Sequence, residues 1–429
     1  MACDVVVPPR IQIQEYGEAL PFSTEGLDLH ALDNANKRWR RELGLAGDPI
    51  RVEDLGSGFV RLRAEAVTGV LRVGNIDVQI APKFLSTVEE SWQAVLWRIL
   101  TVVEGGHVED SLTAAEQLNS QSMPDLLADM FLRSYTKGAA RGLPRGYQSE
   151  KMSGSVLRGS IDISRLGEWI ARPWEVQYTA DFLTDDTPLA RLLRWSAQCL
   201  AATVTAPGRA RALREITAGL AHVSMHPPHL IDAQRISLGI QHQALEPARI
   251  VGLLLLDGAG IHHASGEHAL SGFLWNSDVI YEKYTFWLCQ RAASQHGSRV
   301  DKRRINFGDV ISGAGSRLVM EPDVVFRDDK GTPVAVIDSK YKRLGNRPKS
   351  PDTYQVLSAA HVLGCQRISL AYPVAQDREP TIWRISSALG GRDIELTVLP
   401  LNLMSLAQPY GPQRLIDTIG AWLKRPLFS

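Results

Sequence analysis

The chain is poor in the features that mark secreted, disulfide-rich or membrane proteins. Its 429 residues include only four cysteines, Cys3, Cys199, Cys289 and Cys365, which lie far apart and form no CxxC pair. This pattern disfavours a disulfide framework or a structural zinc site and predicts reduced, mostly buried thiols. No apolar run approaches the length of a membrane span, and the first ten residues lack a basic stretch followed by an apolar core. We therefore expect a cytoplasmic protein that does not associate with a membrane.

Net charge and nucleotide-binding motifs are absent as well. The 47 Lys and Arg residues balance 47 Asp and Glu residues, so the chain as a whole is no electrostatic trap for nucleic acid. No GxxxxGK[ST] phosphate-binding loop occurs, which predicts that the chain does not hydrolyse a nucleotide by itself. Hydrophobic content of 44% and charged content of 22% are those of an ordinary globular protein.

The length and the changes in pattern along the chain predict three domains in an α/β protein, α+β overall. Residues 1–150 combine alternating strand patterns with helices and read as a β-rich N-terminal domain. Residues 151–265 are mainly helical in pattern. Residues 266–429 alternate helices with apolar strands, which favours a mixed sheet flanked by helices.

A predicted β-hairpin in the last of these domains organises the candidate site. The runs RLVMEPDVVF and PVAVID are rich in residues that suit strands, and RDDKGT between them suits a tight reversal. If Lys330 and Gly331 form the turn, residues whose numbers sum to 661 stand opposite each other. Pro322 and Pro333 are the weak points of this register, because proline cannot donate to the hydrogen-bond ladder.

In this register, Asp323 and Asp338 face each other at the ends of apolar strands. Like charges there are about 5 Å apart at Cβ and destabilise the pair. A divalent cation held between them is the simplest reason for the arrangement, because Mg²⁺ is commonly bound through one or two carboxylates. Lys340 leaves the same face as Asp338 if the strand continues. The alternative is that Asp338 only ends the strand and that Ser339 and Lys340 lie in a solvated turn.

Flanking helices offer two more polar residues. FLWNSDVIYEKYTFWLCQRA is predicted to be one helix, on which Glu282 shares a face with Val279 and Phe286. A Glu on an apolar stripe is unusual unless it is paired or bound to a metal, and the alternative is that it reaches solvent or pairs with Arg or Lys. DTYQVLSAAHVLG is predicted to be a helix capped at residue 352 or 353, with Gln355 near its start.

Basic residues gather around this region even though the whole chain is neutral. Residues 299–349 contain 12 Lys or Arg against 7 Asp or Glu. Such residues could contact phosphates of double-stranded DNA, although a solvated surface is the simpler reading of any one of them. The candidates are Lys302, Arg303, Arg304, Lys342, Arg343, Arg347 and Lys349.

The order of Glu282, Pro322-Asp323, Asp338-Ser339-Lys340 and Gln355 resembles the PD-(D/E)xK nuclease pattern. The string IDSKYK followed by TYQ is similar to the McrC family, the nuclease subunits of McrBC-type, modification-dependent restriction systems. GVLRVGNIDVQIAPKF, with its Pro82-Lys83 dipeptide, and the LRGSID segment around Arg158 and Gly159 resemble other parts of McrC. Ser339 stands where Ala is more usual in the pattern.

This resemblance implies a fold, a chemistry and a partner. Residues 266–429 would form a restriction-endonuclease-like domain that cleaves DNA with Mg²⁺ or Mn²⁺. Asp323, Asp338, Glu282 and the carbonyl of Ser339 would hold the metal, while Lys340 and Gln355 would orient water. The partner would be a hexameric, McrB-like AAA+ GTPase that the N-terminal part contacts and stimulates. A regulatory adaptor with a dispensable nuclease site and a motor-independent nuclease are the alternatives.

Overall fold

The chain folds into two compact units, each described here by itself. Unit 1 combines Met1–Leu126 with Gly258–Ser429, and unit 2 is Leu127–Asp257. The division differs from the predicted one, since residue 150 lies inside strand β7 (Gly146–Gly154). The other predicted boundary, at 265, lies outside the described residues. The computed structural model describes residues 10–17, 21–23, 29–73, 76–85, 92–103, 123–140, 142–155, 159–161, 174–257, 259–260, 271–309, 311, 315–386, 392–408 and 410–428.

The N-terminal part of unit 1 is β-rich, as its alternating sequence predicts. Its elements are β1 (Arg10–Gln14), β2 (Phe22–Ser23), α1 (Leu29–Glu42), β3 (Ile50–Gly56), β4 (Phe59–Ala64), β5 (Val67–Val73), β6 (Ile76–Ala81) and α2 (Trp92–Val103). They form a sheet in the order β1-β6-β5-β11-β10 and a smaller one in the order β2-β4-β3. Strands β5 and β6 pair antiparallel, and residues 74 and 75 between them lie outside the described residues.

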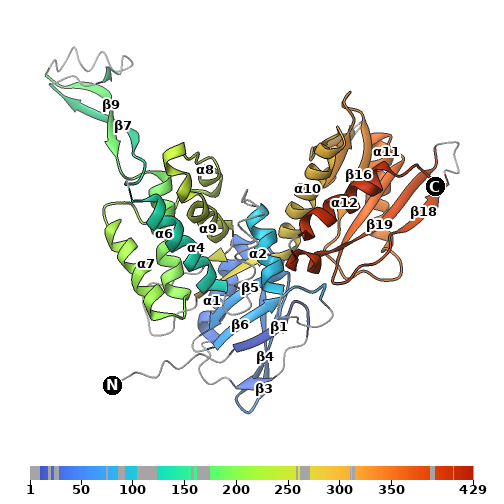
Figure 1. The fold of residues 1–429 in the computed structure, drawn as a ribbon, viewed down its shortest axis with the longest axis horizontal. Coiled ribbons are helices and arrows are strands. Elements are labelled where there is room, and N and C mark those ends of the chain that lie inside the picture. Colours follow the sequence, from blue (N-terminus) through green and yellow to red (C-terminus); the bar gives the residue numbers. More distant parts are fainter. Residues whose placement is uncertain are drawn as a thin grey trace. The chain divides into compact units, whose positions relative to one another are not determined.

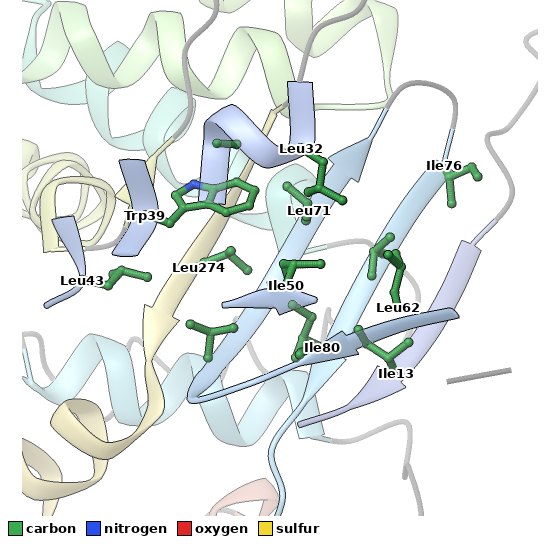
Figure 2. Packing of buried hydrophobic residues seen from close by; sticks show 14 residues of the cluster. Ile13, Leu32, Trp39, Leu43, Ile50, Leu62, Leu71, Ile76, Ile80 and Leu274 are labelled. Carbon is green, nitrogen blue, oxygen red and sulfur yellow. The ribbon is translucent and has the colours of Figure 1, made fainter. Parts of the chain in front are cut away.

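Strand β11 (Ser271–Asn276) joins this N-terminal sheet although it comes 200 residues later in the chain than its neighbour, with Ser271 paired to Arg72. Figure 2 shows Leu274 of β11 in the same core cluster as Trp39 of α1 and Leu71 of β5. All three side chains are fully buried. The N-terminal sheet is therefore completed by the segment that leads directly into the C-terminal part of the unit.

Unit 2 is mostly helical and carries one long hairpin. Its elements are α4 (Met123–Gly138, beginning in unit 1), β7, β8 (Ser160–Ile161), β9 (Val176–Thr184), α6 (Pro188–Thr203), α7 (Pro207–Gly219), α8 (Leu230–Gln234), the 3₁₀ helix η2 (Ile240–Leu245) and α9 (Glu246–Asp257). Helices α6 to α9 confirm the mainly helical pattern predicted for this part of the chain. Helix α6 begins where Thr187 Oγ1 accepts a hydrogen bond from the amide of Ala190 at 3.2 Å, with Pro188 in the first turn. In Figure 1, β7 and β9 extend away from these helices. Arg158 lies outside the described residues.

The C-terminal part of unit 1 contains a six-stranded mixed sheet in the order β12-β15-β16-β17-β19-β18. Strand β17 is buried along its whole length, as expected of a strand between two parallel neighbours. The elements are β10 (Ala259–Gly260), β11, α10 (Ser277–Gln295), β12 (Arg299–Asp301), β13 (Ile305–Gly308), β14 (Leu318–Met320), β15 (Val324–Arg327), β16 (Pro333–Ser339), α11 (Ser350–Leu363), β17 (Arg367–Val374), β18 (Thr381–Ile385), β19 (Ile394–Asn402), the 3₁₀ helix η3 (Leu403–Ala407) and α12 (Gly411–Lys424).

Helices cover both faces of this sheet (Figure 1). Ile368 of β17 packs with Val356 of α11, whereas the neighbouring Arg367 donates to backbone carbonyls at the end of α12. Successive strand residues point to opposite faces, so α11 lies on one face and α12 on the other. Helix α10 packs beside α12 and against β12, β15 and β16. The chain is thus a mixed α/β protein.

Three predicted elements begin at other residues than expected. The run RLVMEPDVVF divides into β14, which pairs with β13, and β15, because Pro322 interrupts the ladder between them. Phe273 belongs to strand β11, and helix α10 begins only at residue 277, where Asn276 Oδ1 caps it by accepting from two backbone amides. Helix α11 starts at Ser350 with Lys349 as its N-cap, earlier than the predicted start.

The structure bears on two predictions, one from the few cysteines and one from the lack of long apolar runs. Cys199, Cys289 and Cys365 are buried, as predicted. No helix within the described ranges is long and apolar enough to cross a membrane.

Candidate active site

The predicted hairpin register is confirmed in β15 and β16. Val324 pairs with Ile337, and the next two pairs follow the same rule, with residue numbers that sum to 661. The one register shift lies at Arg327 and Pro333, on the turn side of these pairs, so it does not reach the site. Asp323 directly precedes β15, and its Oδ2 accepts a hydrogen bond from the amide of Ser339 at 2.7 Å. The hairpin therefore brings Asp323 to the end of β16 that carries Asp338.

The two aspartates share a destabilising environment. Burial, the negative charge of Asp338 and that of Glu282 raise the pKa of Asp323 to about 7, although the Ser339 amide and Lys302 oppose the rise. Burial also raises the pKa of Asp338, which is only 3% exposed, and Lys340 opposes that rise. Asp323 has no ion-pair partner among the described residues. The pair thus holds negative charge that the surrounding protein compensates only in part.

Lys340 joins Asp338 to helix α11. Its Nζ lies 2.5 Å from Asp338 Oδ2 and donates to Gln355 Oε1 at 2.9 Å. The structure therefore brings together the predicted Asp338, Lys340 and Gln355. An ammonium group held between a carboxylate and an amide can transfer its hydrogen bonds to an incoming anion.

Asp352 is a site residue that the sequence interpretation missed. It lies in the first turn of α11, is 5% exposed, and its Oδ1 is 3.9 Å from Lys340 Nζ. Lys342 Nζ lies closer to the same oxygen, at 2.7 Å. The spacing offered a signal, because Asp352 and Gln355 are three residues apart and share a helix face.

Glu282 is placed differently from the prediction. It is half-buried on α10 and forms a short ion pair with Lys302. Val279, predicted to share its apolar face, is 40% exposed, since the buried stripe of the helix runs instead through Ile280 and Tyr284. No group of three or more His, Cys, Asp or Glu in the described ranges is placed to hold a metal ion. The structure therefore places Glu282 near enough for its charge to act on Asp323, but not in a cluster of three described acidic residues placed to hold a metal ion.

The predicted basic residues differ in their partners. Arg303 lies 3.4 Å from Asp301, and Arg304 lies 3.6 Å from Glu321. Lys302 and Lys342 pair with the acidic residues named above, and Arg343 binds N-terminal groups described below. Arg347 and Lys349 are exposed and have no ion-pair partner in the part of the chain that the structure describes.

The donor set suits a hard divalent cation held by two carboxylates. Carboxylate oxygens are the ligands that Mg²⁺ prefers, and the ion commonly keeps several waters. Burial is the main cause of the raised pKa values of Asp323 and Asp338 and negative neighbours add to it, and a bound cation would oppose both effects. The two aspartates therefore fit Mg²⁺, although they do not form a complete protein cage.

Comparison with solved structures bears on the fold. The chain is similar to a chain in a solved structure, the refined half-complex from a tetradecameric assembly of Thermococcus gammatolerans McrB AAA+ hexamers with bound McrC. The two chains share 15% identity with a TM-score of 0.59, and the match covers 96% of this chain and 100% of that chain. A chain of the T. gammatolerans McrBC complex matches with 16% identity and a TM-score of 0.42 over 66% of this chain and 88% of that chain. Only the first score indicates a shared fold.

Sequence comparison gives the family. No curated protein matches the chain significantly. The family described as McrBC 5-methylcytosine restriction system component matches residues 62–373, which is more than half of the chain and includes Asp323, Asp338, Lys340 and Gln355. The chain therefore belongs to the family of McrBC 5-methylcytosine restriction system components, which confirms the resemblance predicted from its sequence.

Proposed function

We propose that this chain is the DNA endonuclease subunit of a modification-dependent, type IV restriction system, with a PD-(D/E)xK site that cleaves phosphodiester bonds. The observation that carries the proposal is the meeting of Asp323 and Asp338 at one end of the hairpin, with Lys340 bound to Asp338. The family match adds the biological setting. A buried and a half-buried carboxylate beside a lysine suit metal-assisted hydrolysis better than any other reaction class.

In this proposal some residues would bind the metal ion, and others would contact the phosphate and the water. Asp323 and Asp338, with the carbonyl of Ser339, would hold Mg²⁺ or Mn²⁺. When bound, the ion polarises the scissile phosphate and lowers the pKa of an attacking water. Lys340 would exchange its contact with Asp338 for the phosphate and stabilise the charge that develops there. Gln355 would keep Lys340 in place and orient the water.

Glu282 is the third carboxylate of the proposed site. It is close enough for its charge to raise the pKa of Asp323, after the larger effects of burial and Asp338. Its ion pair with Lys302 has to open before the carboxylate can bind a metal. We therefore assign Glu282 an auxiliary role, in which Lys302 moves to a DNA phosphate when the substrate is bound.

DNA contacts would come mainly from the basic residues without strong internal partners. Arg347 and Lys349 are exposed between the end of the hairpin and α11. Arg303 and Arg304 have exposed side chains with ion-pair distances longer than 3 Å, and such pairs contribute little to stability. These four residues can neutralise phosphates of double-stranded DNA without a large loss of internal contacts.

The proposed partner is a hexameric, McrB-like AAA+ GTPase that this chain binds and stimulates. The similar T. gammatolerans structure contains McrB AAA+ hexamers with bound McrC. Residues 1–150 remain the predicted docking region, and the start of hairpin β7–β9 lies within it. Tyr147 of β7 pairs with Leu183 of β9, and both are exposed, at 77% and 54%. An exposed apolar pair on a projecting hairpin is typical of an interaction site.

The test is plasmid cleavage with Mg²⁺ by the full chain, with and without the AAA+ partner and GTP. Asp338→Ala and Lys340→Ala should each abolish cleavage, because one removes a metal ligand and the other the phosphate contact. The matched controls are Asp329→Ala and Lys330→Ala, the same changes at exposed positions in the turn of the same hairpin. Both controls should cleave like the unchanged protein.

The outcomes separate the three functions. Full nicking activity in Asp338→Ala or Lys340→Ala would refute the proposed site. If Asp338→Ala loses cleavage but still stimulates the GTPase of the partner, the endonuclease and motor-stimulating roles coexist. Unchanged restriction by that variant would leave the chain as a regulatory adaptor. Cleavage that needs neither partner nor nucleotide would make it a motor-independent nuclease.

A further inference from the structure

The side chains of the four residues 340–343, KYKR, contact two different regions of unit 1 in alternation. Lys340 and Lys342 approach Asp352 of α11, at 3.9 and 2.7 Å. Tyr341 and Arg343 bind residues of the N-terminal sheet instead. The segment that carries the proposed catalytic lysine is therefore held from both sides.

Tyr341 is the buried anchor on the N-terminal side. Its hydroxyl donates a hydrogen bond to Glu15 Oε2 at 2.9 Å, across 326 residues of sequence. The ammonium of Lys83 lies 4.2 Å from the centre of its ring, and Phe84 meets the ring edge-on at 6.3 Å. The ring is thus fixed by a hydrogen bond, a cation–π contact and an aromatic contact.

Arg343 adds a second attachment to the same strands. Its Nε donates to the backbone carbonyl of Lys83 at 2.8 Å, and its Nη2 donates to Gln14 Oε1 at 2.9 Å. Gln14 is itself fixed, because its Nε2 donates to the carbonyl of Leu85. Two parallel neighbours, the ends of β1 and β6, therefore hold both odd-numbered residues of the segment.

Glu15 is an unusual residue for a purely structural contact. It is fully buried, and its Oε1 lies 3.6 Å from the Lys83 ammonium and has no hydrogen-bond partner among the described residues. Its Oε2 also accepts the backbone amide of Lys83 at 3.3 Å. A buried, incompletely hydrogen-bonded ion pair is often less stable than apolar side chains of the same volume, but it can specify one arrangement of its neighbours. The cost suggests that the position of Tyr341 matters.

We propose that Glu15, Lys83 and Tyr341 are positioning residues of the active site, through which the N-terminal sheet sets the location of Lys340. The proposal rests on the proposed nuclease function and adds residues that lie outside the Asp323 and Asp338 pair. It also gives the Pro82-Lys83 dipeptide a physical role, since the turn after β6 presents Lys83 to Glu15 and to the tyrosine ring.

The mechanism is geometric. Lys340 donates its amide to the carbonyl of Ala371 at 2.8 Å, and the amide of Lys342 donates to the carbonyl of Lys340 at 2.8 Å, so the segment turns sharply there. Release of Tyr341 allows this turn to rotate, and Lys340 then moves relative to Asp338 and Gln355. A misplacement of about 1 Å in an active site can reduce the rate about 10²-fold.

The experiment compares two Tyr→Phe variants in the full chain with its AAA+ partner, GTP and Mg²⁺. Tyr341→Phe keeps the ring and removes only the hydrogen bond to Glu15. Tyr284→Phe is the matched control, since its ring is equally buried on α10 and its hydroxyl has no hydrogen-bond partner among the described residues. Single-turnover cleavage and DNA affinity are measured for both.

Tyr341→Phe should lower the maximal cleavage rate by about 10- to 100-fold, with DNA affinity changed less than twofold. Tyr284→Phe should match the unchanged protein in both. Glu15→Leu, which has no acceptor for the Tyr341 hydroxyl, should lower the rate by itself, and the Glu15→Leu, Tyr341→Phe double variant should be no slower than the worse single variant, because both changes remove the same hydrogen bond. Rates within twofold of the unchanged protein in both single variants would overturn the proposal.

Amide hydrogen exchange provides a readout that does not depend on cleavage. The amides of Lys340 and Lys342 should exchange faster in Tyr341→Phe than in Tyr284→Phe, because the turn that protects them is released. If the unchanged protein fails to cleave DNA, the nuclease function fails, and the exchange rates still decide whether the junction holds the segment. Equal exchange in the two variants would count against the positioning role.

Discussion

Two carboxylates in unit 1, the buried Glu15 and the half-buried Asp323, both have a pKa raised to about 7 by burial but differ in their neighbours. Burial raises the pKa of Glu15 to about 7, and Lys83 and the Tyr341 hydroxyl oppose the rise. Burial also raises the pKa of Asp323 to about 7, but there the next largest cause is the neighbouring Asp338, which adds to the rise. Glu15 has the Lys83 ammonium 3.6 Å away, whereas Asp323 accepts the Ser339 amide and forms no ion pair among the described residues, although the charge of Lys302 also opposes the rise.

The difference separates a carboxylate with partners inside the protein from one whose surroundings favour an added cation. Lys83 and the Tyr341 hydroxyl oppose the cost of burying Glu15, although its Oε1 has no hydrogen-bond partner among the described residues. The charge of Asp323 is opposed by a second aspartate and is balanced only when a cation arrives. A native protein keeps such an arrangement when function requires it, since removal of the charge would stabilise the fold.

The largest expected effect is that of Asp323→Asn, which tests the metal side of this comparison. Cleavage should fall by about 10³-fold or more, because a metal ligand contributes several kcal/mol to the transition state. At pH 8 and without divalent ions, the same variant should have a higher melting temperature than the unchanged protein. Asparagine removes the repulsion from Asp338 and can still accept the Ser339 amide.

Thermal unfolding in EDTA and plasmid cleavage with Mg²⁺ measure the two quantities. Asp329→Asn, at an exposed position of the same hairpin, is the control and should change neither. A melting temperature that falls in Asp323→Asn would contradict the idea that this carboxylate is held at an energetic cost.

The second prediction concerns Glu15 and the pH dependence of stability. Between pH 4.5 and about 7 the folded protein keeps the proton on Glu15 that the unfolded chain has released. The contribution of Glu15 to stability is therefore fully present below pH 4.5 and is lost as the pH rises to about 7. The loss amounts to roughly 3 kcal/mol for a shift of this size. Lys83, Asp278 and Tyr341 face the carboxyl group and set its environment.

Urea unfolding at several pH values measures this contribution. Glu15→Gln should make the free energy of unfolding less dependent on pH over that range, because glutamine does not titrate. Asp323 titrates in an overlapping range, so part of the dependence should persist. Glu53→Gln, the same change on an exposed side chain of β3, should leave the dependence as it was, and an equal effect of the two changes would argue against a buried Glu15.

The smallest expected effect is that of Glu282→Gln. Because the carboxylate is paired with Lys302, cleavage should fall by about tenfold or less, far less than in Asp323→Asn. The measurement is the initial cleavage rate over a range of Mg²⁺ concentrations. A loss as large as that of Asp323→Asn, restored by high Mg²⁺, would instead place Glu282 among the principal metal ligands.

Local sequence patterns were sufficient for the hairpin and for most helices. The register of β15 and β16 follows from two apolar runs and a Gly-containing turn, all within a short stretch of chain. The two prolines, which the sequence marked as positions where the register could shift, act locally as well. Pro322 separates β14 from β15, and Pro333 coincides with the register shift.

Local sequence patterns could not predict the contacts between residues far apart in the chain. The residues Phe273 to Trp275 fit a buried helix as well as a strand, and only the free edge of β5 makes them strand β11. Glu282 was expected on a buried stripe, but the packing of α10 turned another face inward. Asp352 was interpreted only as a helix cap, because its contact with Lys342 depends on the loop between β16 and α11.

The sequence by itself determined the elements and the pair of aspartates, since strand alternation and turn chemistry act between near neighbours in the chain. It determined the family as well, because the residues that carry the resemblance lie in short motifs. The tertiary structure alone decided that Glu15 and Lys83 reach Tyr341, and that β11 closes the N-terminal sheet. These contacts join residues hundreds of positions apart, where no local pattern limits the choice of partner and only the packing of the folded unit selects one.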